Sequence, residues 1–325
     1  MVATLEDHQC AALIVFFVAI SGTFANWFIA IFIRRMKTLQ NPFGWLTGSQ
    51  AIGEAVICTL FAFYFVPMVF FDLEWMKYYS YWFGHLSIIF YEICIYSHLF
   101  ISLNRMCAIF LPLRYNHIFS YRNTQILIII SWAAAILPSI YLYMIEDCKF
   151  IYADDYYHFV FTTSNFCLTV AWYFDVWKYI STVILIVSID IVTVTKVHFT
   201  HLAMSKNISN RNAQSRRGDE INFLKQACLQ AGVFVCELIT YFFLEERFEG
   251  KWCKFFLSTF AWNVVHASDG FITIIFNREF RTVIPWLNQR SSIAPTTNKR
   301  MTSSGKLDQG SGTPFHTNES LKSSC

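Results

Sequence analysis

Residues 104–115 read NRMCAIFLPLRY and stand at the end of a long apolar run. An arginine at such an end is often a positively charged anchor at the membrane interface. This stretch, however, also places Asn104 before Arg105 and then adds Pro112 and Tyr115 at short, defined intervals. A simple anchor requires none of these neighbours, so the context of the whole chain must decide what the stretch does.

The composition indicates a membrane protein. Hydrophobic residues make up 55% of the 325 residues and charged residues only 14%, against about 25% charged residues in a typical soluble domain. A helix needs roughly 20 mostly apolar residues to cross a bilayer. Seven runs meet this need, and they predict an all-α membrane protein with a seven-transmembrane helix bundle: 11–33, 43–66, 80–103, 124–145, 176–197, 221–244 and 252–276.

The positive charges predict how this bundle is oriented. The first ten residues contain no Lys or Arg, whereas RRMK follows the first run directly. If the N-terminus is outside, 19 of the 25 Lys and Arg residues fall on the cytoplasmic side, as the positive-inside rule requires. We therefore expect an N-terminus outside and a C-terminus inside.

The same pattern divides the chain into three parts. Residues 1–10 are expected to form the extracellular N-terminus, and residues 11–287 the seven-transmembrane domain. Within the latter, NREFRTVIPWL (277–287) is expected to form a short amphipathic eighth helix on the inner membrane surface. Residues 288–325 are rich in Ser, Thr, Gly and Asn and are expected to be a disordered cytoplasmic tail.

The opening stretch resembles the end of the third helix in rhodopsin-like G-protein-coupled receptors. That family has Asp-Arg-Tyr, then Ala-Ile, then Pro-Leu-x-Tyr, and here the matching residues are Asn104-Arg105-Met106, Ala108-Ile109 and Pro112-Leu113-x-Tyr115. Trp132 followed by Pro138 is similar to the pattern in the family's fourth helix. The chain departs from the main branch at Gln50, where that branch has Asp, and at Asp269-Gly270, where it has Asn-Pro.

These departures resemble one offshoot, the nematode serpentine receptors of class x. The resemblance spans about residues 10–285 and rests on the runs NRMCAIFLPLRYNHIFS, Cys148…Cys167 followed by AWYFD, SIDIVTVTK, EINFLKQA and HASDGFITIIFNREFR. It implies a chemosensory receptor in the plasma membrane, including that of sensory-neuron cilia. Such a receptor senses an extracellular small molecule or peptide, activates a heterotrimeric G protein and is not an enzyme.

The resemblance also implies roles for the inner ends of the helices. Arg105 would meet the G protein, with Pro112 and Tyr115 shaping the loop beside it. Because Asn104 cannot form an ion pair, another acid at the start of the sixth helix, Glu220 or Asp219, would have to hold Arg105 at rest, and we expect Glu220 to do so. Asp190 and Asp269 fall in the cytoplasmic half of their helices, and we interpret them as an activation or packing network that Gln50 could join.

Carboxylates within membrane spans are costly and often functional. Glu54 and Glu92 fall near the middle of the membrane, and Glu237 falls in the outer half of its helix. Hydrogen bonding between helices is the alternative interpretation for each, and the stronger one for Glu54. The candidates for a ligand cavity are His85, Glu92, Glu237, Trp262, Asn263 and His266.

Four cysteines, Cys10, Cys148, Cys167 and Cys253, fall on the oxidising outer side and allow three sets of pairings. We expect Cys148 to pair with Cys167 within the second outer loop.

Two other classes compete with a receptor. A seven-helix ligand-gated channel of the insect type has its N-terminus inside, which the charge distribution opposes. A membrane hydrolase needs His and Asp at metal-ligand spacing, which we do not find, so no metal or cofactor is expected. The expected partners are the ligand, a G protein, membrane lipid and, at the tail, arrestin and a receptor kinase; nucleic acid is not expected.

Overall fold

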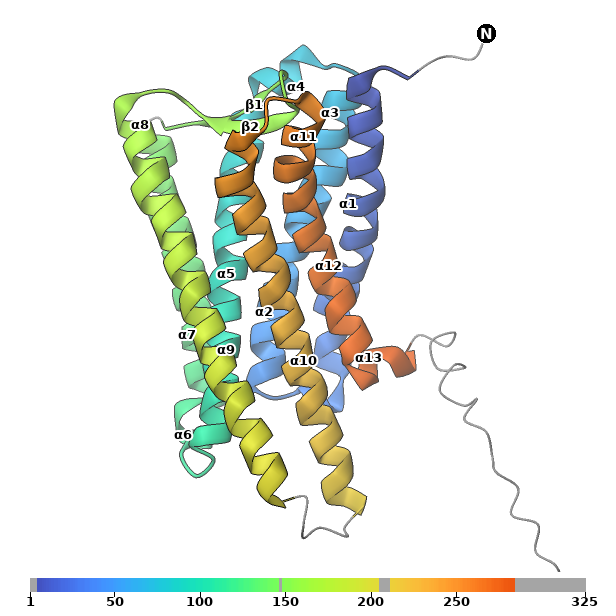
Figure 1. The fold of residues 1–325 in the computed structure, drawn as a ribbon, viewed down its shortest axis with the longest axis vertical. Coiled ribbons are helices and arrows are strands. Elements are labelled where there is room, and N and C mark those ends of the chain that lie inside the picture. Colours follow the sequence, from blue (N-terminus) through green and yellow to red (C-terminus); the bar gives the residue numbers. More distant parts are fainter. Residues whose placement is uncertain (1–4, 146–147, 205–210, 284–325) are drawn as a thin grey trace, which may run out of the picture.

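The computed structural model describes residues 5–145, 148–204 and 211–283. Seven long helical segments lie side by side in one bundle (Figure 1). We refer to them in chain order as the first to the seventh helix: α1 (Asp7–Phe32); α2 (Pro42–Leu60) with η3 (Phe61–Phe65) and α3 (Val66–Phe70); α5 (Ser80–Phe110); α7 (Tyr121–Ser139) with η4 (Ile140–Ile145); α8 (Asn165–Val170), η5 (Ala171–Val176) and α9 (Trp177–Met204); α10 (Arg211–Ile239) with η6 (Thr240–Leu244); and α11 (Lys251–Phe255), η8 (Phe256–Phe260) and α12 (Ala261–Phe276).

Short elements connect these helices. They are η1 (Ile33–Arg35), η2 (Lys37–Leu39), α4 (Glu74–Tyr78), α6 (Tyr115–Ile118), η7 (Glu245–Arg247) and, after the seventh helix, α13 (Arg278–Val283). Within the described residues, the first six helices are long and apolar enough to cross a membrane. The predicted helical membrane fold is therefore confirmed.

Five of the seven helices contain a π-helical turn. These turns are η3, η4, η5, η6 and η8. All five lie toward the same end of the bundle, the end at which β1 and β2 are found (Figure 1). We call it the hairpin end and the opposite end the Arg105 end. π turns inside α-helices are frequent at functional sites.

Local signals determine where several helices begin. The Asn41 side chain accepts a hydrogen bond from the Gly44 amide at 2.9 Å, and Pro42 occupies the first helical position of α2. Ser164 caps the fifth helix in the same way by accepting from the Cys167 amide at 3.1 Å. This cap starts the fifth helix at Asn165, well before the predicted residue 176, so Cys167 lies in a helical turn rather than in a loop.

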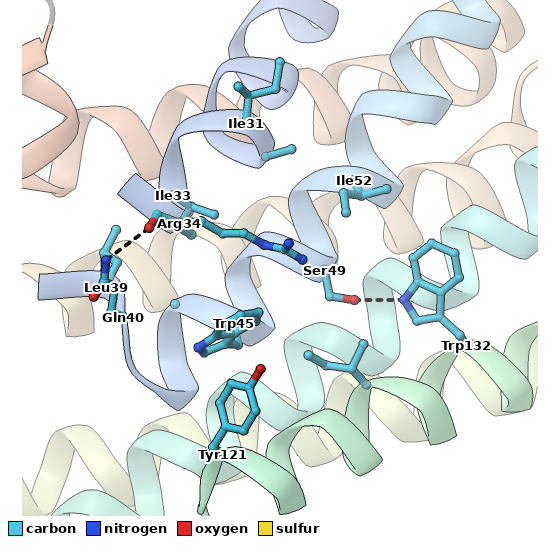
Figure 2. Close-up of a pocket in the computed structure, with 14 residues that line it drawn as sticks. Ile31, Ile33, Arg34, Leu39, Gln40, Trp45, Ser49, Ile52, Tyr121 and Trp132 are labelled. Atoms are coloured by element: carbon cyan, nitrogen blue, oxygen red, sulfur yellow. Dashed lines mark hydrogen bonds between the residues drawn. The ribbon is translucent and has the colours of Figure 1, made fainter. Parts of the chain in front are cut away.

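The helices are tied together by polar contacts as well as by apolar packing. The Trp132 indole N–H of the fourth helix donates to the Ser49 hydroxyl of the second at 2.9 Å (Figure 2). Beyond the seventh helix, the Phe280 side chain of α13 is fully buried and packs against Phe28 of the first helix, with ring centroids 5.9 Å apart. The Glu279 carboxylate of α13 also accepts from the Thr38 amide at 3.3 Å, so the described part of the expected eighth helix is held by an aromatic contact and a hydrogen bond.

A two-stranded antiparallel hairpin, which the sequence did not predict, closes the hairpin end. Its strands are β1 (Phe150–Ala153) and β2 (His158–Phe161), with Phe150 opposite Phe161. The hairpin lies directly on the third helix, because a Cβ at Gly84 would collide with the Phe150 carbonyl. Only glycine allows this close approach.

Candidate functional site

Arg105 joins the third helix to the fifth and sixth helices. Its guanidinium donates to the Phe223 carbonyl at 3.2 Å, to the Ser102 hydroxyl at 3.2 Å and to the Asp190 carboxylate at 3.4 Å. The Arg105 and Asp190 side chains are only 10% and 5% exposed. Because a guanidinium keeps its charge, burial at this depth requires such a partner. The structure therefore places Asp190 at Arg105, while the side chain of Glu220 lies outside the described residues.

The loop after the third helix is fastened by an amide. The Asn104 side chain donates to the Tyr115 hydroxyl at 3.1 Å, and the Tyr115 ring stacks on Phe119 with centroids 5.9 Å apart. Pro112 is exposed, and its neighbour Leu113 is 100% exposed. The loop after the third helix thus exposes a leucine, and the place of this leucine in Pro-Leu-x-Tyr was the available sequence signal.

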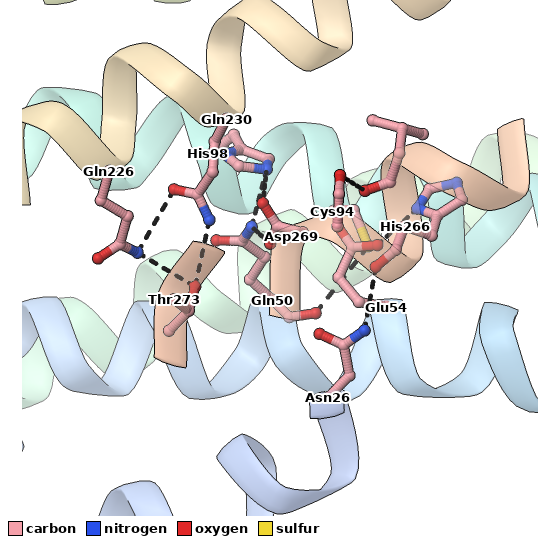
Figure 3. A network of polar contacts seen from close by, with 12 residues as sticks. Asn26, Gln50, Glu54, Cys94, His98, Gln226, Gln230, His266, Asp269 and Thr273 are labelled. Atoms are coloured by element: carbon pink, nitrogen blue, oxygen red, sulfur yellow. Dashed lines mark hydrogen bonds and ion pairs between the residues drawn. The ribbon is translucent and has the colours of Figure 1, made fainter. Parts of the chain in front are cut away.

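A polar network occupies the middle of the bundle between the first, second, third, sixth and seventh helices (Figure 3). Gln50 donates to the Asp269 carboxylate and lies 2.7 Å from the His98 imidazole. Glu54 lies 2.5 Å from His266 Nδ1, and both of these side chains are fully buried. The predicted neighbours Gln50 and Asp269 are thus in contact, and Glu54 and His266 lie in the same network.

The network extends toward Arg105 along the sixth helix. Gln226 and Gln230 donate to the Thr273 hydroxyl of the seventh helix at 3.1 and 3.2 Å. Gln226 lies one turn from Phe223, whose carbonyl accepts from Arg105. The Gln226–Thr273 contact between the sixth and seventh helices therefore lies within one helical turn of the Arg105 contact.

Two sets of side chains in this network have metal-ligand chemistry. The donor atoms of Glu54, Cys94 and His266 lie within 4.8 Å of one another, as do those of Glu54, His98 and Asp269. In both sets a carboxylate already faces an imidazole, Glu54 with His266 and Asp269 with His98 at 3.6 Å. We therefore describe them as a polar network.

A second ionic cluster lies nearer the hairpin end, between the third and fifth helices. The Lys178 ammonium lies 2.5 Å from the Glu92 carboxylate and 3.4 Å from that of Asp175. Asp175 also accepts from the Tyr143 hydroxyl at 3.1 Å. Glu92 is thus paired with a lysine of its own bundle, an arrangement that the sequence did not reveal because Lys178 and Asp175 stand at the edge of their apolar run.

A cavity of about 380 Å³ opens between the hairpin and the third, fifth, sixth and seventh helices. Its lining is mostly aromatic and apolar, with carboxylates at a few points; it includes Ile88, Tyr91, Phe159, Trp172, Asp175, Val176, Tyr179, Glu237, Tyr241, Glu245 and Trp262. The Glu237 carboxylate accepts from the Tyr91 hydroxyl at 3.0 Å. A small number of polar groups on an apolar wall is typical of a small-molecule site.

Two of the six proposed pocket residues, Glu237 and Trp262, line this cavity. The other four lie elsewhere. His85 stacks on Tyr143 of the fourth helix with centroids 5.3 Å apart, and Glu92 pairs with Lys178. His266 pairs with Glu54, and Asn263 is fully buried. His85 and Glu92 share one face of the third helix but contact the fourth and the fifth helix respectively, because the neighbouring helix changes along the length of the third.

Covalent and ionic links hold the hairpin over the cavity. The predicted disulfide between Cys148 and Cys167 is present and joins the approach to β1 to the fifth helix. The Lys77 ammonium lies 2.6 Å from Asp72 and 2.7 Å from Asp154, which joins the loop after the second helix to the turn of the hairpin. The Lys77 hydrogen bond lowers the pKa of the exposed Asp72 carboxyl.

His158 on the hairpin gives this end of the molecule a pH dependence. Burial and the Lys254 ammonium lower the pKa of His158 from 6.5 to about 4. A base with a lowered pKa binds fewer protons in the folded state than in the unfolded chain, so its contribution to stability is lost as the pH falls from about 6.5 toward 4. We expect the backbone amides of β2 to have lower protection factors at pH 5 than at pH 7, where each factor compares the measured exchange rate with the intrinsic rate at the same pH. The variant His158→Gln should remove most of this difference, and an unchanged difference would assign it to another group.

Comparison with known proteins relates this arrangement to one family. The family described as "Serpentine type 7TM GPCR chemoreceptor Srx" matches residues 16–277. Serpentine receptor class X 45 of Caenorhabditis elegans is 32% identical over 292 residues, which cover 85% of this chain and 81% of that protein. Serpentine receptor class X-43 of the same organism is 27% identical over 299 residues, which cover 91% of each.

Among solved structures, squid rhodopsin has a similar fold. Its crystal structure aligns with a TM-score of 0.70 at 15% sequence identity, over 88% of this chain and 86% of that one. At this identity the likeness concerns the fold alone.

Proposed function

Because this chain belongs to the Srx family of serpentine seven-transmembrane chemoreceptors, we propose that it senses an extracellular small molecule or peptide and activates a heterotrimeric G protein. We place the hairpin end outside the cell and the Arg105 end in the cytoplasm, in agreement with the distribution of Lys and Arg. We further assign the receptor to the plasma membrane, including that of sensory cilia.

The observation that carries the proposal is the position of Arg105. Its contact with the Phe223 carbonyl joins the third and sixth helices directly, so a movement of the sixth helix away from the third must break it. That movement would uncover Arg105 beside the exposed Leu113, where a G protein could bind. Two arrangements of one element, each favoured by a different partner, are the physical basis of such signalling.

Tyr91 links the cavity to this switch. Its hydroxyl donates to Glu237 in the cavity wall at 3.0 Å, while its ring lies 5.5 Å from that of His266 in the central network. A ligand that competes for Glu237 would therefore disturb a residue that contacts the network. The aromatic wall and the Glu237 carboxylate favour a compact, largely apolar ligand that carries a hydrogen-bond donor.

Guanine-nucleotide exchange on added G protein, measured with receptor reconstituted in vesicles, tests the proposal. We expect an active compound from a screen of volatile and secreted small molecules to raise the exchange rate. Ligand-evoked current through the same vesicles without G protein would instead identify a ligand-gated channel. Phosphorylation of the tail by a receptor kinase and capture of arrestin would follow activation.

We predict that Glu237→Leu raises the half-maximal ligand concentration about tenfold, because it removes the carboxylate that accepts the ligand's hydrogen bond, worth about 1–2 kcal/mol when buried. Tyr91→Phe should lower this concentration, because it removes the hydroxyl with which the ligand competes for Glu237. Tyr241→Phe, in the same cavity wall, is the control. An unchanged half-maximal concentration in both variants would show that the ligand binds elsewhere.

A further inference from the structure

A second hollow lies on the side of the bundle near the Arg105 end, between the first, second and fourth helices (Figure 2). Its volume is about 670 Å³, within the range of sites that hold organic ligands. Its walls come from helices that are long and apolar enough to cross a membrane, and Ile31 and Tyr121 on its rim are more than half exposed. In a bilayer this groove therefore opens toward lipid.

The walls of the groove are apolar and are held in place by polar contacts behind them. Ile31, Ile52, Ile128 and Trp132 line its length. The bond from Trp132 to Ser49 fixes one wall. At Gly48, an added Cβ would meet only the Ile33 side chain, at 3.2 Å, so the space in front of this glycine belongs to the groove.

Arg34 introduces a positive charge into this apolar site. Its guanidinium extends over the Trp45 ring, 5.1 Å from the centroid, and points along the groove toward Ser49 (Figure 2). In the described part of the chain, no carboxylate forms an ion pair with Arg34, in contrast to the pairing of Arg105 with Asp190. A permanent charge at a membrane surface is stabilised by an anion.

We propose that this groove binds an anionic phospholipid, with its phosphate on Arg34 and an acyl chain along Ile31, Ile52 and Trp132. The planar guanidinium can donate two parallel hydrogen bonds to a phosphate, and the apolar wall excludes a purely polar anion as the preferred occupant. In the orientation proposed above, Arg34 lies at the cytoplasmic leaflet, where anionic lipids are concentrated.

Native mass spectrometry of the purified full-length receptor tests this site. Micelles would contain phosphatidylcholine and phosphatidylserine in equal amounts, and retained lipids would be counted. We expect wild type to retain phosphatidylserine preferentially, and Arg34→Gln to lower its retention about fivefold to tenfold. The matched control is Arg35→Gln, which removes the same charge one residue away, from a guanidinium that lies over Phe32 and does not line the groove. Equal losses in the two variants would overturn the proposal in favour of diffuse charge attraction.

Two further arms identify what occupies the groove. Gly48→Leu should fill the apolar part and lower phosphatidylserine retention while Arg34 is kept. Glycerophosphoserine, which has the headgroup without acyl chains, should not displace the bound lipid. Displacement by that headgroup, or by a sterol with equal effect in wild type and Arg34→Gln, would contradict the proposal. Thermal unfolding of each variant checks that it is folded. If Gly48→Leu does not fold, the comparison of Arg34→Gln with Arg35→Gln still tests the proposal.

Discussion

Asp190→Asn is expected to raise ligand-independent nucleotide exchange about threefold to tenfold. Asp190 is the acid that faces Arg105 in the buried contact between the third and fifth helices. Removing its charge frees the guanidinium and weakens the arrangement in which Arg105 also holds the Phe223 carbonyl of the sixth helix. A shift of about 1.4 kcal/mol between two states changes their ratio tenfold, and breaking a buried ion pair exceeds this amount.

The control for this prediction is Asp175→Asn, which removes a carboxylate from the same helix but at the Lys178 cluster. It should leave the basal rate of exchange unchanged. Arg105→Gln should abolish coupling, alone or together with Asp190→Asn. If Glu220→Gln raises basal exchange and Asp190→Asn does not, the carboxylate that holds Arg105 at rest is that of Glu220, as expected from the sequence.

Glu54→Ala or His266→Ala is expected to lower the free energy of unfolding by about 1–3 kcal/mol, since each leaves a fully buried polar partner unsatisfied. This exceeds the roughly 0.6 kcal/mol average for a hydrogen bond between membrane helices. Thermal unfolding of purified receptor in one detergent would measure the loss as a lower midpoint.

The matched variant for this pair carries Glu54→Leu and His266→Phe together. Because both polar groups are replaced by apolar side chains of similar size, it should lose less stability than either single substitution. A double variant that loses the sum of the two single effects would show that the pair is not coupled.

The helices were predictable because their signal is local: each needs only about 20 apolar residues in a row. The contacts between side chains of different helices were less predictable. Gln50 and Asp269 were expected in one network and do lie in contact. The contact between Glu54 and His266 was not predicted from the sequence. The pairing of Glu92 with Lys178 was not predicted at all. Which of several groups at one depth will meet depends on helix rotation, which periodicity does not determine.

The β1–β2 hairpin was not predicted, for a different reason. Its strands are four residues each, too short for alternation to distinguish them from a loop, and they are stabilised by the bundle beneath them. The Phe150 backbone lies against Gly84 and the Thr259 hydroxyl donates to the Tyr157 carbonyl at 2.8 Å. Both contacts join segments far apart in sequence.

The five π turns have a consequence for how such receptors diverge. Each inserts an extra residue, which rotates the rest of the helix by about 100° relative to an uninterrupted α-helix. The segments on the hairpin side of η6 and η8 are therefore out of phase with the residues of the central network on the same helix. One half of a helix can then accept new side chains without disturbing the other half. Receptor chimaeras that exchange recognition but keep signalling should accordingly be joined on the Arg105 side of these turns, with the inserted residue carried along.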